Sequence, residues 1–262
     1  MRKKVILIST IIMCLTIITA VAVKKRQYKS IINVPNMDSY ITLSAKDIVN
    51  NQIEESIENN QETYAFFANM FGIDINNLKQ EISESVDNQF NELDILNTGE
   101  NKKNIDLALI EYLTALENKK PELFNRKYSY KETNKQYVYN LIEYFVSLYP
   151  SVDVRTAKAI TWIETGNLEA NSMLRKNNIF GGMSNGKLTE YSSIEYGVYK
   201  YISLLKNNYF DKGLVTIEQI GYKYNPTIID GVKQANPTWV NNVNAYRNKF
   251  ASDIKITSVS QL

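Results

Sequence analysis

An uncharged apolar segment near the N-terminus, Val5–Val23, constrains this chain most strongly. Basic residues flank it on both sides, Arg2–Lys4 before it and Lys24–Arg26 after it. A helix needs roughly 20 mainly apolar residues to cross a bilayer, and this segment is just long enough. We therefore expect residues 1–27 to form a single transmembrane signal anchor.

A cleaved signal peptide is the alternative interpretation of the same segment. Ala20-Val21-Ala22 has the small-x-small form of a cleavage site. The basic residues that follow directly favour an uncleaved anchor at the membrane edge. Because both flanks are basic, the charges do not fix the orientation of the anchor.

The composition excludes several kinds of chemistry. The chain has no histidine and one cysteine, Cys14, which lies inside the apolar segment. These absences remove Ser-His-Asp and Cys-His catalysis, histidine-ligated zinc and disulfides, so we expect no metal and no cofactor. The net charge is only +2, and no basic patch is interleaved with aromatic residues, which argues against a nucleic-acid partner. Carboxylates are the default candidates for any catalysis.

Residues 28–126 are rich in Asn, Gln, Glu and Lys. Apolar residues recur at helical spacing in Glu62–Phe71, Ile75–Val86 and Ile105–Glu117, and Gly72 predicts a turn between the first two helices. We interpret this region as a helical spacer or accessory domain, through which a partner from the envelope machinery could be recruited.

Residues 127–252 differ in character, because tyrosines become frequent and glycines cluster. The spacing predicts a helix over Thr133–Tyr149, ended by Pro150, and a second over Val154–Thr165. Ser151 or Asp153 can cap the second helix, and Gly166 is a natural stop for it. Further elements are expected at Ser184–Gly186 (a β-hairpin turn), Ile194–Asn207 and Pro237–Phe250 (helices), followed by a tail over residues 253–262.

Glu164 stands at the end of an apolar helix. The helix is apolar nearly all round, through Ala157, Ala159, Ile160, Trp162 and Ile163, so we expect it in the core. An unpaired carboxylate there is costly to keep ionised, and the negative end of the helix dipole raises the pKa further. Cleavage of a glycosidic bond requires an acid that is still protonated near neutral pH. The alternative is an ordinary helix-end glutamate, exposed or paired with Lys158.

Several motifs surround this helix in a fixed order: Glu164-Thr165-Gly166, Asn177–Gly181, Thr189-Glu190-Tyr191, Ser193–Tyr199, Tyr222–Pro226 and Asn236–Val243. In this order they resemble the bacterial endo-β-N-acetylglucosaminidase family of autolysins and flagellar wall hydrolases, glycoside hydrolase family 73. The resemblance spans roughly Tyr128 to Phe250 and says nothing about the N-terminal half. Two departures matter: Asn167-Leu168 replaces an aromatic of the family, and Thr227–Ala235 splits the tyrosine motif. Tyr222 or Tyr224 could therefore be the matching tyrosine, and Tyr224 fits better.

The resemblance implies a lysozyme-like fold, mainly α (α+β), with a small β-hairpin beside a groove. Glu164 would protonate the glycosidic oxygen. Glu190 would be the second carboxylate, which activates water or steadies the oxocarbenium-like transition state. Tyr224 could instead orient the substrate's own 2-acetamido group as internal nucleophile. A solvated hairpin charge is the alternative interpretation of Glu190.

Five further residues are candidates for substrate binding: Asn178, Phe180, Tyr191, Tyr222 and Trp239. We expect Asn178 and Phe180 to shape the groove wall, and the aromatic residues belong to the core as often as they form sugar platforms.

The expected function is cleavage of β-1,4 bonds after N-acetylglucosamine in peptidoglycan glycan strands, on the outer side of the cell membrane. A lytic transglycosylase on the same fold is one alternative, although Asn177–Gly182 differs from the phrase usual in those enzymes. A non-catalytic wall-binding scaffold subunit is another.

Overall fold

The computed structural model describes residues 57–89, 102–125 and 127–262. The predicted anchor, residues 1–27, lies outside these ranges. Within them, no helix combines the length and the apolar character needed to cross a membrane. The chain divides into two compact units, residues 1–125 and 126–262. The described residues are mainly helical with two small two-stranded sheets, which confirms the predicted mainly α fold.

The first unit contains three described helices and a short 3-10 turn: α3 (Gln61–Phe71), α4 (Ile75–Gln89), α5 (Lys102–Lys119) and η1 (Pro121–Leu123). Gly72 ends α3 in the left-handed conformation, at φ 75°, and its N–H bonds back to Ala68. Asp74 then caps α4 by accepting from the N–H of Asn76 at 2.8 Å. The predicted turn at Gly72 is therefore present.

This unit has an apolar core of its own. Phe67, Phe71, Leu78 and Leu113 are completely buried. Lys120, just after α5, forms an ion pair with Glu81 of α4 at 2.7 Å. These contacts make the described part of residues 57–125 a packed helical body.

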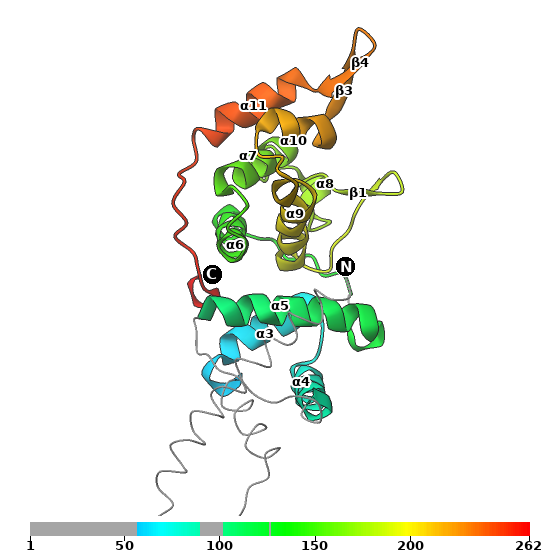
Figure 1. The fold of residues 1–262 in the computed structure, drawn as a ribbon, viewed down its shortest axis with the longest axis vertical. Helices are drawn as coiled ribbons and strands as arrows, with labels where there is room; N and C mark the ends of the chain where they lie inside the picture. The colour runs from blue at the N-terminus through cyan, green and yellow to red at the C-terminus, as the bar shows by residue number, and fades with distance from the viewer. Residues whose placement is uncertain (1–56, 90–101, 126) are drawn as a thin grey trace, which may run out of the picture. The chain divides into compact units, whose positions relative to one another are not determined.

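The second unit carries the candidate site and runs through α6 (Lys135–Leu148), α7 (Val154–Thr165), α8 (Asn171–Leu174), β1 (Met183–Ser184), β2 (Lys187–Leu188), α9 (Ile194–Asn208), η2 (Phe210–Lys212), α10 (Ile217–Tyr224), β3 (Pro226–Ile229), β4 (Val232–Ala235), α11 (Pro237–Arg247) and η3 (Val259–Gln261). Figure 1 shows α10, α11 and the β3–β4 hairpin together at one end of this unit, next to α7. Helices α6, α7, α9 and α11 were expected close to these bounds, although α11 ends at Arg247 rather than Phe250, and α8 and α10 were not predicted.

Helix α7 is the central element. Asp153, and not Ser151, caps it by accepting from the N–H of Thr156 at 2.9 Å. Ala157, Ala159 and Ile160 of α7 are completely buried, as expected for a core helix. The helix packs against α6 and α11, and the buried Tyr201 hydroxyl of α9 donates to the Ala157 carbonyl at 2.8 Å.

The two hairpins have the same type of turn. In β1–β2, Asn185 and Gly186 have φ values of 51° and 74°, at the predicted turn. In β3–β4, Asp230 and Gly231 have φ values of 53° and 77°. Positive φ at both central residues is the signature of a type I′ hairpin turn. The sequence analysis treated the β3–β4 segment only as an insertion and missed its strands.

The segment after α11 is held against the helices by Glu143 of α6. Its carboxylate forms a buried ion pair with Lys158 at 2.5 Å and accepts from the backbone N–H groups of Lys255 and Ile256 at 2.8 and 3.2 Å. Burial disfavours the charged form, but these bonds outweigh it and lower the pKa of Glu143. Lys158 is thereby engaged with Glu143, so the suggested pairing of Lys158 with Glu164 is wrong.

Candidate active site

The Glu164 side chain lies in the last turn of α7 and is half-buried. Its Oε1 accepts a hydrogen bond from the indole Nε1 of Trp239 at 3.0 Å. Its Oε2 lies against the backbone of Gly181, where an added Cβ would stand 3.1 Å away. Two segments outside α7 therefore lie next to the carboxyl group, and one of them donates a hydrogen bond to it.

Burial raises the pKa of the Glu164 carboxyl above its usual range, and the hydrogen bond from Trp239 offsets part of this rise. In the described part of the chain, no lysine or arginine forms an ion pair with Glu164. The pKa rise predicted from the buried helix is therefore confirmed. A carboxyl group in this state retains its proton to higher pH than an exposed glutamate and can donate it to a bound ligand.

The loop that carries Gly181 is organised by Asn178. This side chain is completely buried. Its amide nitrogen donates to the carbonyls of Gly182 and Thr189 at 2.8 and 3.0 Å, and its oxygen accepts from the N–H groups of Phe180 and Gly182. All of these partners are backbone groups of the protein. Asn178 thus shapes the wall beside Glu164 from within.

Phe180 supports the same loop by packing. Its ring is buried between Tyr201 and Tyr191, with ring centroids at 4.9 and 5.9 Å and nearly parallel planes. Tyr191 is partly exposed, and burial raises the pKa of its hydroxyl. An added Cβ on Gly182 would stand 2.6 Å from the Phe180 ring, so only glycine fits there.

Tyr224 and Trp239 close the other side of the site. Their rings stack with centroids 5.4 Å apart, and the Tyr224 hydroxyl donates to the carbonyl of Phe180. Trp239 is buried, and burial also raises the pKa of the Tyr224 hydroxyl well above its usual range. Tyr224 and Trp239 thus link α10 and α11 to the Gly181 loop. The indole N–H of Trp239 points at Glu164, and its ring is buried instead of facing the solvent.

Glu190 and Tyr222 lie outside this cluster. Glu190 follows β2, is exposed, and forms an ion pair with Lys176 at 3.4 Å. Tyr222 lies on α10 with 49% of its surface exposed, and the Nζ of Lys233 stands 4.9 Å above its ring. Of the predicted site residues, the structure brings Phe180, Tyr224 and Trp239 together around Glu164, with Asn178 and Tyr191 supporting the loop.

The backbone directly after Glu164 is unusual. Gly166, Asn167 and Leu168 all have left-handed φ values, 57°, 60° and 59°. This conformation costs a residue other than glycine about 1–2 kcal/mol. The N–H of the buried Leu168 bonds to the Thr165 hydroxyl at 2.8 Å, which helps to hold the turn. Such strained segments cluster at functional sites. The turn coincides with the Asn167-Leu168 departure from the family pattern.

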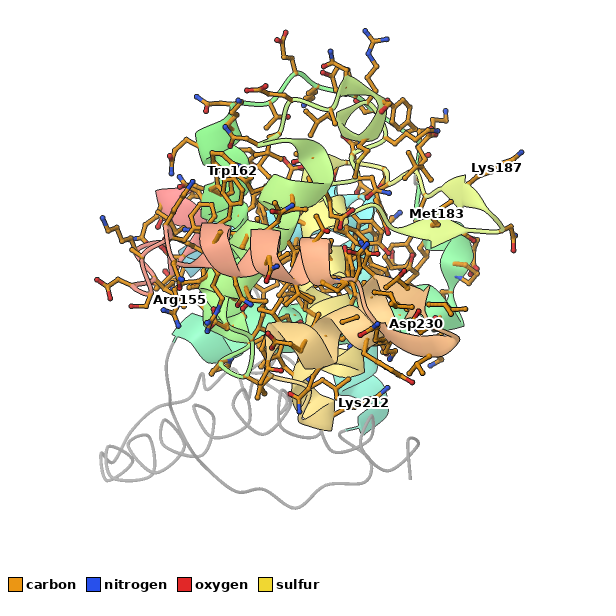
Figure 2. All side chains as sticks on the ribbon, turned by 90° about the horizontal axis from the view of Figure 1, so that it is seen from above. Arg155, Trp162, Met183, Lys187, Lys212 and Asp230 are labelled. Carbon is orange, nitrogen blue, oxygen red and sulfur yellow. The ribbon has the colours of Figure 1, made fainter. Side chains whose placement is uncertain are left out.

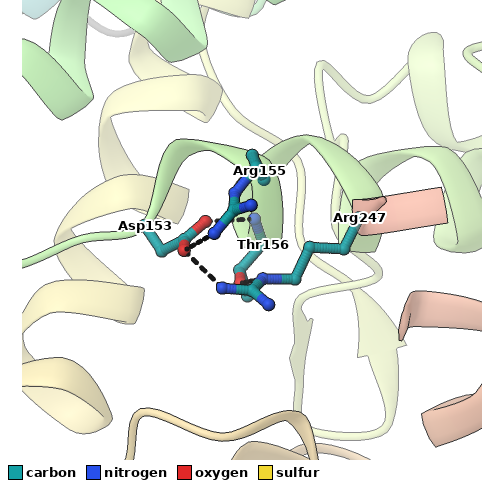
Figure 3. A network of polar contacts seen from close by, with 4 residues as sticks. All are labelled: Asp153, Arg155, Thr156 and Arg247. Atoms are coloured by element: carbon teal, nitrogen blue, oxygen red, sulfur yellow. Dashed lines mark hydrogen bonds and ion pairs between the residues drawn. The ribbon is translucent and has the colours of Figure 1, made fainter. Parts of the chain in front are cut away.

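A polar network fixes α11 on α7, and Figure 3 shows its four residues. Arg247 of α11 donates to the Asp153 carboxylate at 2.6 Å and to the Thr156 hydroxyl at 3.0 Å. Arg155 adds a longer ion pair to the same carboxylate at 3.4 Å. The network therefore helps to hold α11, which carries Trp239, against α7, which carries Glu164.

Sequence reasoning missed Gly181 as a site residue, and it did not predict that Lys176 pairs with Glu190. Gly181 stood inside a recognised motif, and only the fold places its backbone against Glu164. In the portion of the chain described here, no group of three or more Cys, Asp or Glu side chains is arranged to hold a metal ion. Comparisons with models of known protein families, with curated proteins and with solved structures gave no match to this chain.

Proposed function

We propose that this chain is a glycoside hydrolase that cleaves the β-1,4 bonds after N-acetylglucosamine in peptidoglycan strands, with Glu164 as general acid. One observation carries the proposal: a half-buried carboxyl whose pKa is raised by burial and whose one oxygen faces an indole N–H. The ordered motifs that resemble the glucosaminidase family supply the substrate class. A mainly helical unit with a hairpin beside the acid is compatible with the lysozyme-like fold that this proposal includes.

The first chemical step follows from the surroundings of Glu164. Its protonated carboxyl donates to the glycosidic oxygen as the bond breaks. The carboxylate left behind accepts the Trp239 N–H more strongly than the neutral acid does, because hydrogen bonds to charged acceptors are the stronger ones. Trp239 therefore stabilises the product of proton transfer, while burial keeps the proton in place until a substrate arrives.

Two routes remain for the second step. Glu190, which is exposed and lies beside Lys176, would activate water or steady the oxocarbenium-like transition state. Alternatively, the substrate's own 2-acetamido group would act as internal nucleophile. The Tyr224 hydroxyl donates to the Phe180 carbonyl. Tyr224 would have to give up this hydrogen bond in order to orient the acetamido group of the substrate.

We further propose that residues 1–27 anchor the chain in the cell membrane with the catalytic unit outside, unless the segment is cleaved as a signal peptide. The helical body within residues 28–126 would then be a spacer or the docking domain for an envelope partner.

A lytic transglycosylase is the second candidate, and one observation favours it. Burial raises the pKa of Glu164, whereas Glu190 is exposed and paired with Lys176. A transglycosylase needs a single acid and no hydrolytic water.

Mass spectrometry of the fragments released from purified peptidoglycan distinguishes these functions. A reducing N-acetylglucosamine end supports the hydrolase, and 1,6-anhydro-N-acetylmuramic acid identifies the transglycosylase. Binding to peptidoglycan without release of fragments would identify a scaffold subunit and contradict both.

A further inference from the structure

The β3–β4 hairpin is joined directly to the candidate site. It begins at Pro226, two residues after Tyr224, and ends at Ala235, shortly before Trp239. Its base is packed closely, because a Cβ added to Gly221 would stand 3.1 Å from both the Ala235 side chain and the Trp239 ring. Each strand has four residues, so at about 3.3 Å per residue the hairpin extends about 13 Å from its base.

The outer part of this hairpin exposes aliphatic side chains. Ile228, Ile229 and Val232 have 72%, 40% and 64% of their surfaces exposed. Met183 on the β1–β2 hairpin is exposed to 64%. Figures 1 and 2 both show the two hairpins projecting on the same side of the unit, with Met183, Lys187 and Asp230 labelled there in Figure 2. Ile229 pairs with Val232 and Ile228 with Lys233, so the Ile229–Val232 pair lies on the opposite face of the hairpin from Ile228. Exposed aliphatic side chains on a hairpin joined to a candidate active site indicate a binding surface.

The pairing of the strands indicates what this surface binds. Ile228 stands opposite Lys233, so an aliphatic side chain and an ammonium group share one face of the hairpin. Aliphatic groups offer sugar hydroxyls no hydrogen bond, so they suit a ligand with methyl groups, and the ammonium suits a carboxylate. The peptide stems of peptidoglycan strands carry methyl groups in their alanine residues and carboxylates in their acidic residues. They branch from the strand next to the bonds that a strand-cutting enzyme must reach.

We propose that the β3–β4 hairpin is a subsite for the peptide stems of peptidoglycan, through Ile228 and Lys233. This inference rests on the proposed function and deepens it: the enzyme selects strands that carry peptides. The short links to Tyr224 and Trp239 place a bound stem beside the sugar whose bond Glu164 cleaves.

The test compares cleavage rates of the full chain on two soluble substrates, peptide-bearing glycan strands and the same strands stripped of peptide by an amidase. Wild-type protein should cut peptide-bearing strands roughly tenfold faster, the lower range for discrimination by apolar contacts. The double variant Ile228→Thr, Lys233→Gln should lose this preference and keep the wild-type rate on stripped strands. Val215→Ser changes an exposed aliphatic residue outside the hairpins, with 56% of its surface exposed, and should keep the preference.

Three other outcomes would overturn the proposal, and the measured rates distinguish them. A rate ratio near one for wild-type protein, or a ratio unchanged in the double variant, removes the stem subsite and leaves the hairpin as a surface for a protein partner. An equal loss on both substrates means that the hairpin merely supports the site. Cleavage of neither substrate by wild-type protein refutes the hydrolase function itself, and the subsite with it.

Discussion

Replacing Gly181 with alanine perturbs the Glu164 carboxyl by adding a single methyl group. Gly181 has a left-handed φ of 70°, and the new Cβ would stand 3.1 Å from Oε2 of Glu164. The backbone strain costs about 1–2 kcal/mol. The contact is tighter than ordinary van der Waals distance, so the carboxyl must shift by a few tenths of an ångström. We expect a loss of about tenfold in cleavage rate, since misplacing a reacting group by about 1 Å can cost about 10²-fold.

Gly186→Ala is the matched control. Gly186 has φ 74° on the same segment of chain, and its added Cβ would meet nothing within 4 Å. Gly186→Ala should therefore lose about 1–2 kcal/mol of stability, and Gly181→Ala at least as much, as measured by thermal or denaturant unfolding. Only Gly181→Ala should lose activity on purified peptidoglycan beyond what its stability explains. Equal activities in the two variants would refute the idea that the position of Glu164 against Gly181 matters.

Two further predictions concern the groups around α7. Trp239→Phe removes the hydrogen bond that lowers the pKa of Glu164, so this pKa should rise. Because the acid acts when protonated, the decline of kcat/KM with rising pH should move to higher pH. A decline at the same pH as in wild type, or at a lower pH, would contradict the role of Trp239 in lowering the pKa of Glu164. Asp153→Ala removes the α7 cap and the Arg247 ion pair and should destabilise the protein by about 1–2 kcal/mol at neutral pH. Burial opposes the charge of Asp153, but the bonds from Arg247 and Thr156 outweigh it and lower its pKa. Its stabilisation is thus present above the unfolded-state pKa and is lost as the pH falls through the folded-state pKa, so the wild-type and variant unfolding curves should converge in acid.

Helices α6, α7, α9 and α11 of the second unit were predicted because their signals are local. Asp153 before the apolar run and Gly166 after it fix both ends of α7, and the structure has the same bounds. The β3–β4 hairpin was missed although Asp230-Gly231 between short apolar runs is a type I′ turn signal. The resemblance to the family treats this segment as an insertion between the Tyr222–Pro226 and Asn236–Val243 motifs, so its strands were not predicted.

The contacts within the site could not be read from sequence spacing. The predicted rise in the Glu164 pKa needed only the burial of its own helix. The indole of Trp239 meets that carboxyl through the packing of α11 on α7, which no local pattern encodes. Glu190 likewise has its partner, Lys176, on a segment before the hairpin. Its role as second carboxylate remains a prediction.

Peptidoglycan clearing by Glu164→Gln, beside Glu190→Gln and wild-type protein, tests the central claim most directly. Glutamine keeps the shape of Glu164 but has no transferable proton, so clearing should fall by at least about 10²-fold. Burial raises the pKa of Glu164, so this group contributes stability below its unfolded-state pKa and loses it as pH rises through the folded-state pKa. The Gln variant should therefore unfold at neutral pH at a temperature no lower than wild type. Glu190→Gln should lose less activity, and an equal loss would favour direct activation of water by Glu190. Clearing by Glu164→Gln at near the wild-type rate would contradict the assignment of Glu164 as the acid.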